Sequence, residues 1–354
     1  MRLTCFALSA MLSIVITTTA CDSGDVKGPQ GGQEADDEVN AVAEAIDFGS
    51  AAGIQGPRPT PDDGPATRAS SSFSESLTQR ITDDLRNGED IVVTSYVAMW
   101  YEHSESPSEN LYWGALYGHE AMFRPGRYSE IRRRLPFVEV SRYDKLVDIE
   151  RTTDPLRIQV LAASIPRDVD DAESTGRLVV VNLAYHDMKR AAMDMGIQLR
   201  TGRLPAAASE EPEVRRYLEK SYLIGYWGHN VYYNGANVDC LERVPVSRDD
   251  GPRGVFMVGC QFARWFPQKF RAPGIEPLLF TTTNMAPEAY IALALYDGIA
   301  RGLPRTDVRF NVAEAYRVYQ RLENRPMSLF VNEWSDIGKR MAVLPDCPES
   351  LSTR

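Results

Sequence analysis

The sequence predicts an α/β fold, a three-layer α/β/α sandwich in which helices cover both faces of a mostly parallel sheet. The first observation is a set of short, almost continuous apolar runs, which are typical of strands buried on both faces of such a sheet. The second is that segments with helical periodicity separate several of these runs, as in strand–helix–strand units. The runs cover residues 91–98, 157–163, 178–183, 221–228, 254–259 and 277–281.

Three helical patterns lie between or after these runs. Residues 185–199 follow the third run, and residues 285–300 follow the sixth, where Asn284 and Pro287 are start signals. A further helix is predicted to begin at Asn311, because a glutamate three residues later stands in the position of a capping partner.

The folded part of the chain is predicted to begin near residue 73. Ser72-Phe73-Ser74-Glu75 has the spacing of a capping box, and Leu77, Ile81 and Leu85 then recur at helical spacing until Asn87-Gly88 ends the pattern. Residues 73–354 show neither an internal repeat nor a second linker. They are long enough to bury a substantial core, so we expect one globular domain.

The start of the chain, at positions 1–20, predicts a secretory signal peptide. Arg2 supplies a positive start, residues 6–16 are apolar but too few to span a bilayer, and small residues precede Cys21. Thr18-Thr19-Ala20-Cys21 resembles a bacterial lipobox, although threonine replaces the usual leucine. That resemblance implies an exported protein whose Cys21 carries lipid acyl chains such as palmitate and is anchored in a membrane. The alternative is ordinary cleavage after Ala20.

Residues 21–72 predict a disordered acidic tether between the anchor and the domain. Residues 22–72 hold ten acidic and three basic residues, so they carry −7 of the whole chain's net charge of −10. A segment so poor in large apolar residues cannot bury a core. The domain is left nearly neutral, which argues against nucleic acid as a partner. The short run Arg132-Arg133-Arg134 is interpreted as a solvated helix face.

Polar residues follow the predicted strands, where parallel α/β sheets bind their ligands. Three of the four histidines are among them, whereas His119 is expected to lie at a distance. The simpler interpretation is that loops are polar in any case. The residues concerned are Trp100, Tyr101, Glu102, His103, Tyr185, His186, Asp187, His229, Asn230, Cys260, Thr282, Thr283 and Asn284.

The most specific pattern is a pair of apolar strands that end in Gly228-His229 and Gly259-Cys260. If the two strands are neighbours, the histidine and the cysteine lie side by side in the fold, although they are distant in the sequence. An imidazole in that place can deprotonate a thiol or stabilise the thiolate, which is the reactive species. The pattern therefore predicts His229 as the general base or acid and Cys260 as the nucleophile.

This pattern resembles the caspase, gingipain and clostripain group of cysteine peptidases. The resemblance covers about residues 178–300 and implies a caspase-like sandwich, a peptide or protein substrate, and an oxyanion hole formed by the backbone at Gly228 and Cys260. The aromatic pair Trp265-Phe266 is similar to the gingipain branch. Gly-His-Asn at 228–230 and Met-Ala-Pro-Glu-Ala-Tyr at 285–290 also resemble segments of a bacterial branch of lipoproteins.

The sequence departs from that group at two points. The usual His-Gly is replaced by His229-Asn230, so the oxyanion donor must come from Gly228 or from the Asn230 backbone in another conformation. No acidic specificity residue is evident. The alternative is therefore a non-catalytic surface-binding lipoprotein with a degenerate caspase-like fold.

Cysteine usage leaves two interpretations of Cys260 open. A cysteine at the end of an apolar strand often only fills space, and in an exported protein any two of Cys240, Cys260 and Cys347 can form a disulfide. The enzyme interpretation requires a Cys240–Cys347 bridge that leaves Cys260 free.

Two weaker hypotheses use the same edge. His103, His186, His229, Glu102 and Asp187 are suitable metal ligands, but no short motif fixes two of them on one face, so no metal is predicted. Trp100, Tyr112, Trp113, Tyr117 and Tyr226 are candidates for an aromatic platform that binds a ligand or carbohydrate, although aromatic residues more commonly pack in a core. No phosphate-binding glycine motif follows a strand, so no nucleotide or other cofactor is predicted.

Overall fold

The computed structural model describes residues 75–99, 107–115, 117–124, 135–144, 155–168, 171–232, 238–246 and 251–334. The predicted signal peptide, the lipidation site Cys21 and the tether lie outside these residues, as do residues 100–103 and Cys347. Among the described residues, none of the helices has the length and apolar character needed to cross a membrane.

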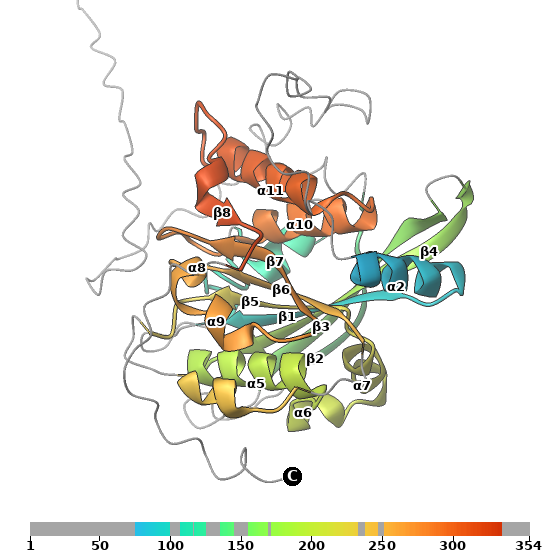
Figure 1. Cartoon of the computed structure of the whole chain (residues 1–354), viewed down its shortest axis with the longest axis horizontal. Coiled ribbons are helices and arrows are strands. Elements are labelled where there is room, and N and C mark those ends of the chain that lie inside the picture. Colours follow the sequence, from blue (N-terminus) through green and yellow to red (C-terminus); the bar gives the residue numbers. More distant parts are fainter. Residues whose placement is uncertain are drawn as a thin grey trace, which may run out of the picture.

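The domain is built on one eight-stranded mixed sheet in the order β2-β3-β4-β1-β5-β6-β7-β8 (Figure 1). The five strands β4, β1, β5, β6 and β7 are parallel, and antiparallel pairs complete both edges. The strands are β1 Ile91–Ala98, β2 Val138–Asp144, β3 Pro155–Asp168, β4 Asp171–Tyr185, β5 Leu223–Gly228, β6 Arg253–Val258, β7 Ile275–Thr281 and β8 Phe330–Val331.

Helices lie on both sides of this sheet, with α10 and α11 on one side and α5 and α6 on the other (Figure 1). The predicted α/β class is therefore confirmed. The helices are α2 Glu75–Arg86, α3 His119–Phe123, α5 Met188–Thr201, α6 Ala206–Ser209, α7 Pro212–Glu219, α8 Phe262–Trp265, α9 Pro267–Phe270, α10 Ala289–Ala300 and α11 Arg305–Tyr319, with short 3₁₀ turns η1 Asp239–Arg243 and η2 Met327–Leu329.

All six predicted apolar runs correspond to strands, although residues 221–222 and 259 lie just outside β5 and β6, and one run has the wrong direction. The run 157–163 belongs to β3, which forms an antiparallel hairpin with β4 rather than a parallel neighbour. An apolar run indicates that both faces of a strand are buried, but it does not indicate the direction of the strand. β3 is an internal strand because β2 pairs with its outer edge.

The helix boundaries follow local capping chemistry. In α2, Leu77 and Leu85 are buried as the periodicity predicts, and Gly88 adopts the left-handed φ of 86° after the helix. The Asp187 carboxylate accepts a hydrogen bond from the Arg190 backbone at the start of α5.

Three predicted helix starts were wrong. The helix expected from residue 185 begins at Met188, because Tyr185 is still part of β4. The helix expected from residue 285 begins at Ala289, and the helix expected at Asn311 begins at Arg305, one residue after Pro304. Asn311 instead lies buried within α11 and donates a hydrogen bond to the Ala294 carbonyl oxygen, which ties α11 to α10.

Candidate functional site

The topology points to the carboxyl ends of β1 and β5 as the place to look for a ligand site. From β1 the chain passes to β4 on one side and then returns to β5 on the other, so β1 and β5 form the point at which the strand order reverses. Open α/β sheets bind ligands at the carboxyl ends of the two strands that flank such a point. His229 directly follows β5, whose last residue Gly228 is the partner of Ala98 at the end of β1.

The strands that end near His229 and Cys260 are neighbours, as the sequence predicts. β5 and β6 pair in parallel up to Trp227 and Val258. Beyond this pair the backbone turns in the same way on both strands, because Gly228 has a φ of 152° and Gly259 a φ of 154°. Asn230 Nδ2 then donates a hydrogen bond of 2.7 Å to the Cys260 carbonyl oxygen. The adjacency of the two strand ends is therefore confirmed.

Cys260 itself has different chemistry from that of the predicted nucleophile. Cys260 is disulfide-bonded and only 2% exposed, whereas Cys240 is a free, buried cysteine. The pairing that the enzyme interpretation requires, Cys240–Cys347 with a free Cys260, was wrong. Because Cys240 is free, the partner of Cys260 lies outside the described residues. A sulfur held in a disulfide is not a thiolate and cannot attack a carbonyl group.

The predicted oxyanion donors lie at the same place. Gly228 and Cys260 are both buried. The carbonyl oxygen of Gly259, which follows β6, accepts a hydrogen bond from the Thr281 hydroxyl at the end of β7. This edge is therefore held by hydrogen bonds across β5, β6 and β7. An oxyanion role for Gly228 and Cys260 depends on a thiolate that the disulfide removes.

His229 is a partly exposed, neutral imidazole. Its Nε2 lies 2.9 Å from the Tyr112 hydroxyl, and the two rings meet edge to face. The Tyr226 hydroxyl donates a hydrogen bond to the His229 carbonyl oxygen. Burial lowers the pKa of His229 to about 4, so the ring is uncharged at neutral pH. It can exchange hydrogen bonds with a ligand but carries no charge there.

Other predicted edge residues divide into structural and solvent-facing groups. Asp187 caps α5, and the partly exposed His186 precedes it. Thr283 and Asn284 after β7 are exposed, and Asn284 Oδ1 accepts a hydrogen bond from Gln261 Nε2. His103 and Glu102, two of the proposed metal ligands, lie outside the described residues. The part of the chain that the structure describes contains no group of three or more metal-ligating side chains.

The proposed aromatic platform was wrong for the residues that the structure describes in it, apart from the partly buried Tyr117. Trp113 and Tyr226 are fully buried, and Tyr112 is 6% exposed. These rings pack within the core, which removes more apolar surface from water than a surface platform would.

His119 lies close to the site, contrary to expectation. It is fully buried on α3, its Nδ1 is 3.1 Å from the Tyr112 carbonyl oxygen, and its ring meets Trp227 of β5 edge to face at 5.1 Å. Burial lowers its pKa to about 4. Tyr112 thus connects the two histidines, His229 through its hydroxyl and His119 through its backbone.

Glu288 is a second residue that sequence reasoning did not single out. Its Oε2 accepts hydrogen bonds from the Tyr290 hydroxyl and from Gln320 Nε2, which joins the start of α10 to the end of α11. Burial raises its pKa to about 7. Three tyrosine rings, of Tyr117, Tyr290 and Tyr319, pack against one another beside it. The one available signal was its place in the Met-Ala-Pro-Glu-Ala-Tyr segment.

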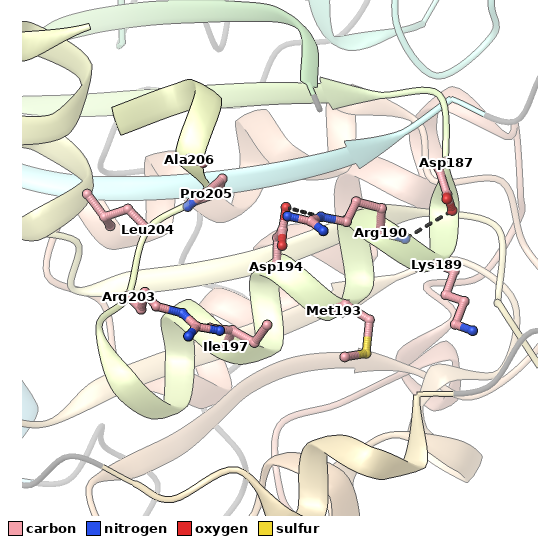
Figure 2. A pocket seen from close by; sticks show the side chains of 10 residues that line it. All are labelled: Asp187, Lys189, Arg190, Met193, Asp194, Ile197, Arg203, Leu204, Pro205 and Ala206. Carbon is pink, nitrogen blue, oxygen red and sulfur yellow. Dashed lines mark hydrogen bonds and ion pairs between the residues drawn. The ribbon is translucent and has the colours of Figure 1, made fainter. Parts of the chain in front are cut away.

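A groove of about 550 Å³ lies beside α5 and the segment that follows it (Figure 2). It begins at Asp187, next to the carboxyl edge of the sheet, and ends at the segment between α5 and α6. Its lining residues are Asp187, Lys189, Arg190, Met193, Asp194, Ile197, Arg203, Leu204, Pro205 and Ala206.

Comparisons with protein-family models, with curated proteins and with solved structures find no match to this chain. Functional inference therefore depends on the geometry of the site and on the sequence.

Proposed function

We propose that this protein is an exported lipoprotein, anchored by acyl chains on Cys21, whose domain has a caspase-like three-layer arrangement and binds a ligand without cleaving it. The observation that carries this proposal is the disulfide at Cys260. The peptidase interpretation needs Cys260 as a free thiol, whereas the disulfide uses its sulfur.

The disulfide also supports export. Disulfides persist in the periplasm and outside the cell and are rare in the reducing cytosol. Cleavage before Cys21 leaves four cysteines in the mature chain, of which Cys21 is lipidated and Cys240 is free and buried. The bridge of Cys260 then goes to Cys347. This assignment uses every cysteine of the mature chain.

The strand order is one that the proposed caspase-like arrangement shares with other doubly wound α/β sheets. Numbered along the chain, the parallel strands β4-β1-β5-β6-β7 have the order 2-1-3-4-5, with helices on both sides of the sheet. The histidine and cysteine positions correspond to those that the resemblance implies, at the ends of the third and fourth parallel strands. A disulfide at the second position makes this a degenerate site.

The ligand is expected to carry uncharged hydrogen-bonding groups. His229 is neutral at physiological pH and contacts the Tyr112 hydroxyl at the carboxyl ends of β1 and β5. A neutral imidazole and a phenol exchange hydrogen bonds with amides or hydroxyls, whereas a charged ligand would favour a charged partner.

Thiol accessibility tests the disulfide on which this proposal rests. The mature protein is treated with iodoacetamide while folded, then denatured and labelled with a second reagent, and its peptides are mapped without reduction. We expect no labelling of Cys260 in either step, labelling of Cys240 only after denaturation, and one peptide pair that links Cys260 to Cys347. Rapid labelling of folded Cys260 that slows in His229→Ala would instead establish the peptidase interpretation.

The anchor is tested separately with a fatty-acid analogue in a host that processes lipoproteins. Labelled wild-type protein and unlabelled Cys21→Ala protein are expected. Unlabelled wild-type protein would refute the lipid anchor and leave the thiol result unaffected.

A further inference from the structure

The groove along α5 combines an apolar floor with a cationic rim. Met193 and Ile197 on α5 and Leu204 beyond its end form the floor, and Figure 2 shows their side chains together with those of Lys189 and Arg203. Within the described part of the chain, Lys189 and Arg203 are exposed and have no carboxylate partner. The groove therefore suits an apolar ligand face flanked by negative charge.

The positive charge of the rim is not cancelled by the acidic residues of the lining. Asp194 forms an ion pair of 2.9 Å with Arg190 and also accepts a hydrogen bond from the Tyr185 hydroxyl. Asp187 caps α5. Asp187 keeps its charge although it caps α5, so the lining has three positive and two negative side chains and a net charge of +1.

The tether contains one segment with complementary chemistry. Residues 36–48 include five acidic residues and no basic residue, and Val39, Val42 and Ile46 recur at helical spacing. Asp36 stands at the start as a capping residue, and Gly49 follows at the end. On a helix the three apolar side chains share one face, with the acidic side chains of Asp36, Glu38 and Asp47 on either side of it.

We propose that residues 36–48 dock into the α5 groove as an amphipathic helix. Val39, Val42 and Ile46 contact the apolar floor, and the acidic side chains face Lys189 and Arg203. An isolated helix as short as this one is marginal in water, so this segment gains its helical order from the contact.

The linker that follows is long enough for this contact within one molecule. Residues 49–74 separate the segment from α2, and a flexible chain of that length has an end-to-end distance of roughly 28 Å and a maximum reach of about 85 Å. Such a linker gives an effective concentration on the order of 1 mM, so an interaction with a dissociation constant near 100 μM is about 90% formed.

Docking sets how far the domain extends from its anchor. With the segment bound, only residues 22–35 separate Cys21 from the docked helix, about 45 Å at full extension. Release adds the rest of the tether. The docking contact does not depend on lipidation, so it is testable on a soluble chain.

Hydrogen exchange of the full mature chain carrying Cys21→Ser tests the proposal. We expect the amides of residues 40–47 to exchange about tenfold more slowly than those of residues 50–56 in the same tether. Ile46→Asp in the segment, and separately Lys189→Glu with Arg203→Glu in the groove, should each abolish that difference. The matched control Arg86→Glu with Arg321→Glu makes the same charge change at exposed positions outside the groove and should retain it.

Charge exchange makes the test specific. Glu38→Lys with Asp47→Lys should restore protection in the Lys189→Glu, Arg203→Glu background, because these two side chains flank the apolar face. Unchanged slow exchange in the β5 amides of every variant verifies that the domain is folded. Equal exchange along the whole tether of the wild type, or protection that persists in the groove variant, would overturn the proposal. Protection that grows with protein concentration would also overturn it, because the occupant would then be the tether of a second copy.

Discussion

Protonation of His229 is expected to destabilise the domain between pH 7 and pH 5. Burial lowers the folded-state pKa to about 4 from the ordinary value of 6.5, so the unfolded chain takes up the proton first as the pH falls. The contribution of a neutral His229 to stability is therefore complete above pH 6.5 and is lost progressively as the pH falls towards 4.

The size of the effect follows from these two pKa values. Between pH 7 and pH 5, the linkage relation gives a loss of about 2 kcal/mol in the free energy of unfolding for one such histidine. His229→Gln keeps an amide within reach of the Tyr112 hydroxyl but does not titrate. The variant should therefore lose about 2 kcal/mol less than the wild type over the same pH range.

Urea unfolding at pH 7 and pH 5 measures this difference, and His119 contributes equally to both proteins. An NMR titration of the His229 ring provides an independent check, with a midpoint expected near pH 4. Equal losses of stability in wild type and variant, or a midpoint near 6.5, would show that burial does not lower the pKa of His229.

Three further substitutions test the packing and charges around the site. Glu288 is expected to destabilise the protein at high pH rather than at low pH, because burial raises its pKa to about 7 and disfavours its charged form in the folded state. Glu288→Gln should stabilise the protein by about 3 kcal/mol at pH 8 and have little effect at pH 4, as judged by urea unfolding. Burial alone would raise the pKa of Glu120, but its hydrogen bonds and ion pairs with three arginines lower that pKa to about 2, so Glu120→Gln should cost about 3 kcal/mol at pH 7. This cost should disappear as the pH falls from 4.5 to 2, and a cost independent of pH would contradict the assignment. Gly259→Ala brings a methyl group to 2.1 Å from the Gly228 carbonyl oxygen and should cost about 3 kcal/mol or more, whereas Gly274→Ala, with open space around it, should cost only about 1 kcal/mol. Similar thermal stabilities for these two glycine variants would refute the close contact.

The sheet could be predicted from the sequence because strands buried on both faces have continuous apolar sequences. β1 has eight buried residues in succession, and β5 and β6 each have six, so their apolar runs have no polar alternation. The sequence of β3 does not indicate its direction. Its pairing depends on the turn into β4 and on β2 covering its outer edge, which are contacts between segments rather than properties of one run.

The site was predicted in part for a similar reason. The adjacency of His229 and Cys260 follows once two parallel strands are neighbours, because parallel strands end at the same edge. The disulfide could not be predicted, since three cysteines allow several pairings and only distances in the fold decide among them. His119 and Glu288 gave no periodic signal. Their importance comes from burial next to Trp227 and Tyr290, which residues distant in the sequence create.

The glycines that first suggested a catalytic edge have a sufficient structural reason. Both glycines have positive φ angles, and neither position has space for a side chain. A Cβ at Gly228 would lie 2.8 Å from Ala98 of β1, whereas a Cβ at Gly259 would lie 2.1 Å from the Gly228 carbonyl oxygen, because the ends of β5 and β6 approach closely. That approach permits the Asn230 amide to bond to the Cys260 carbonyl oxygen. The hydroxyl of Thr281 on β7 donates a hydrogen bond to the Gly259 carbonyl oxygen and accepts one from the Gly259 N–H. A nucleophile needs an open position for the substrate carbonyl, whereas these contacts and the disulfide close the edge at Cys260. The partly exposed His229, at the carboxyl ends of β1 and β5, can still contact a ligand, which favours ligand binding over peptide cleavage.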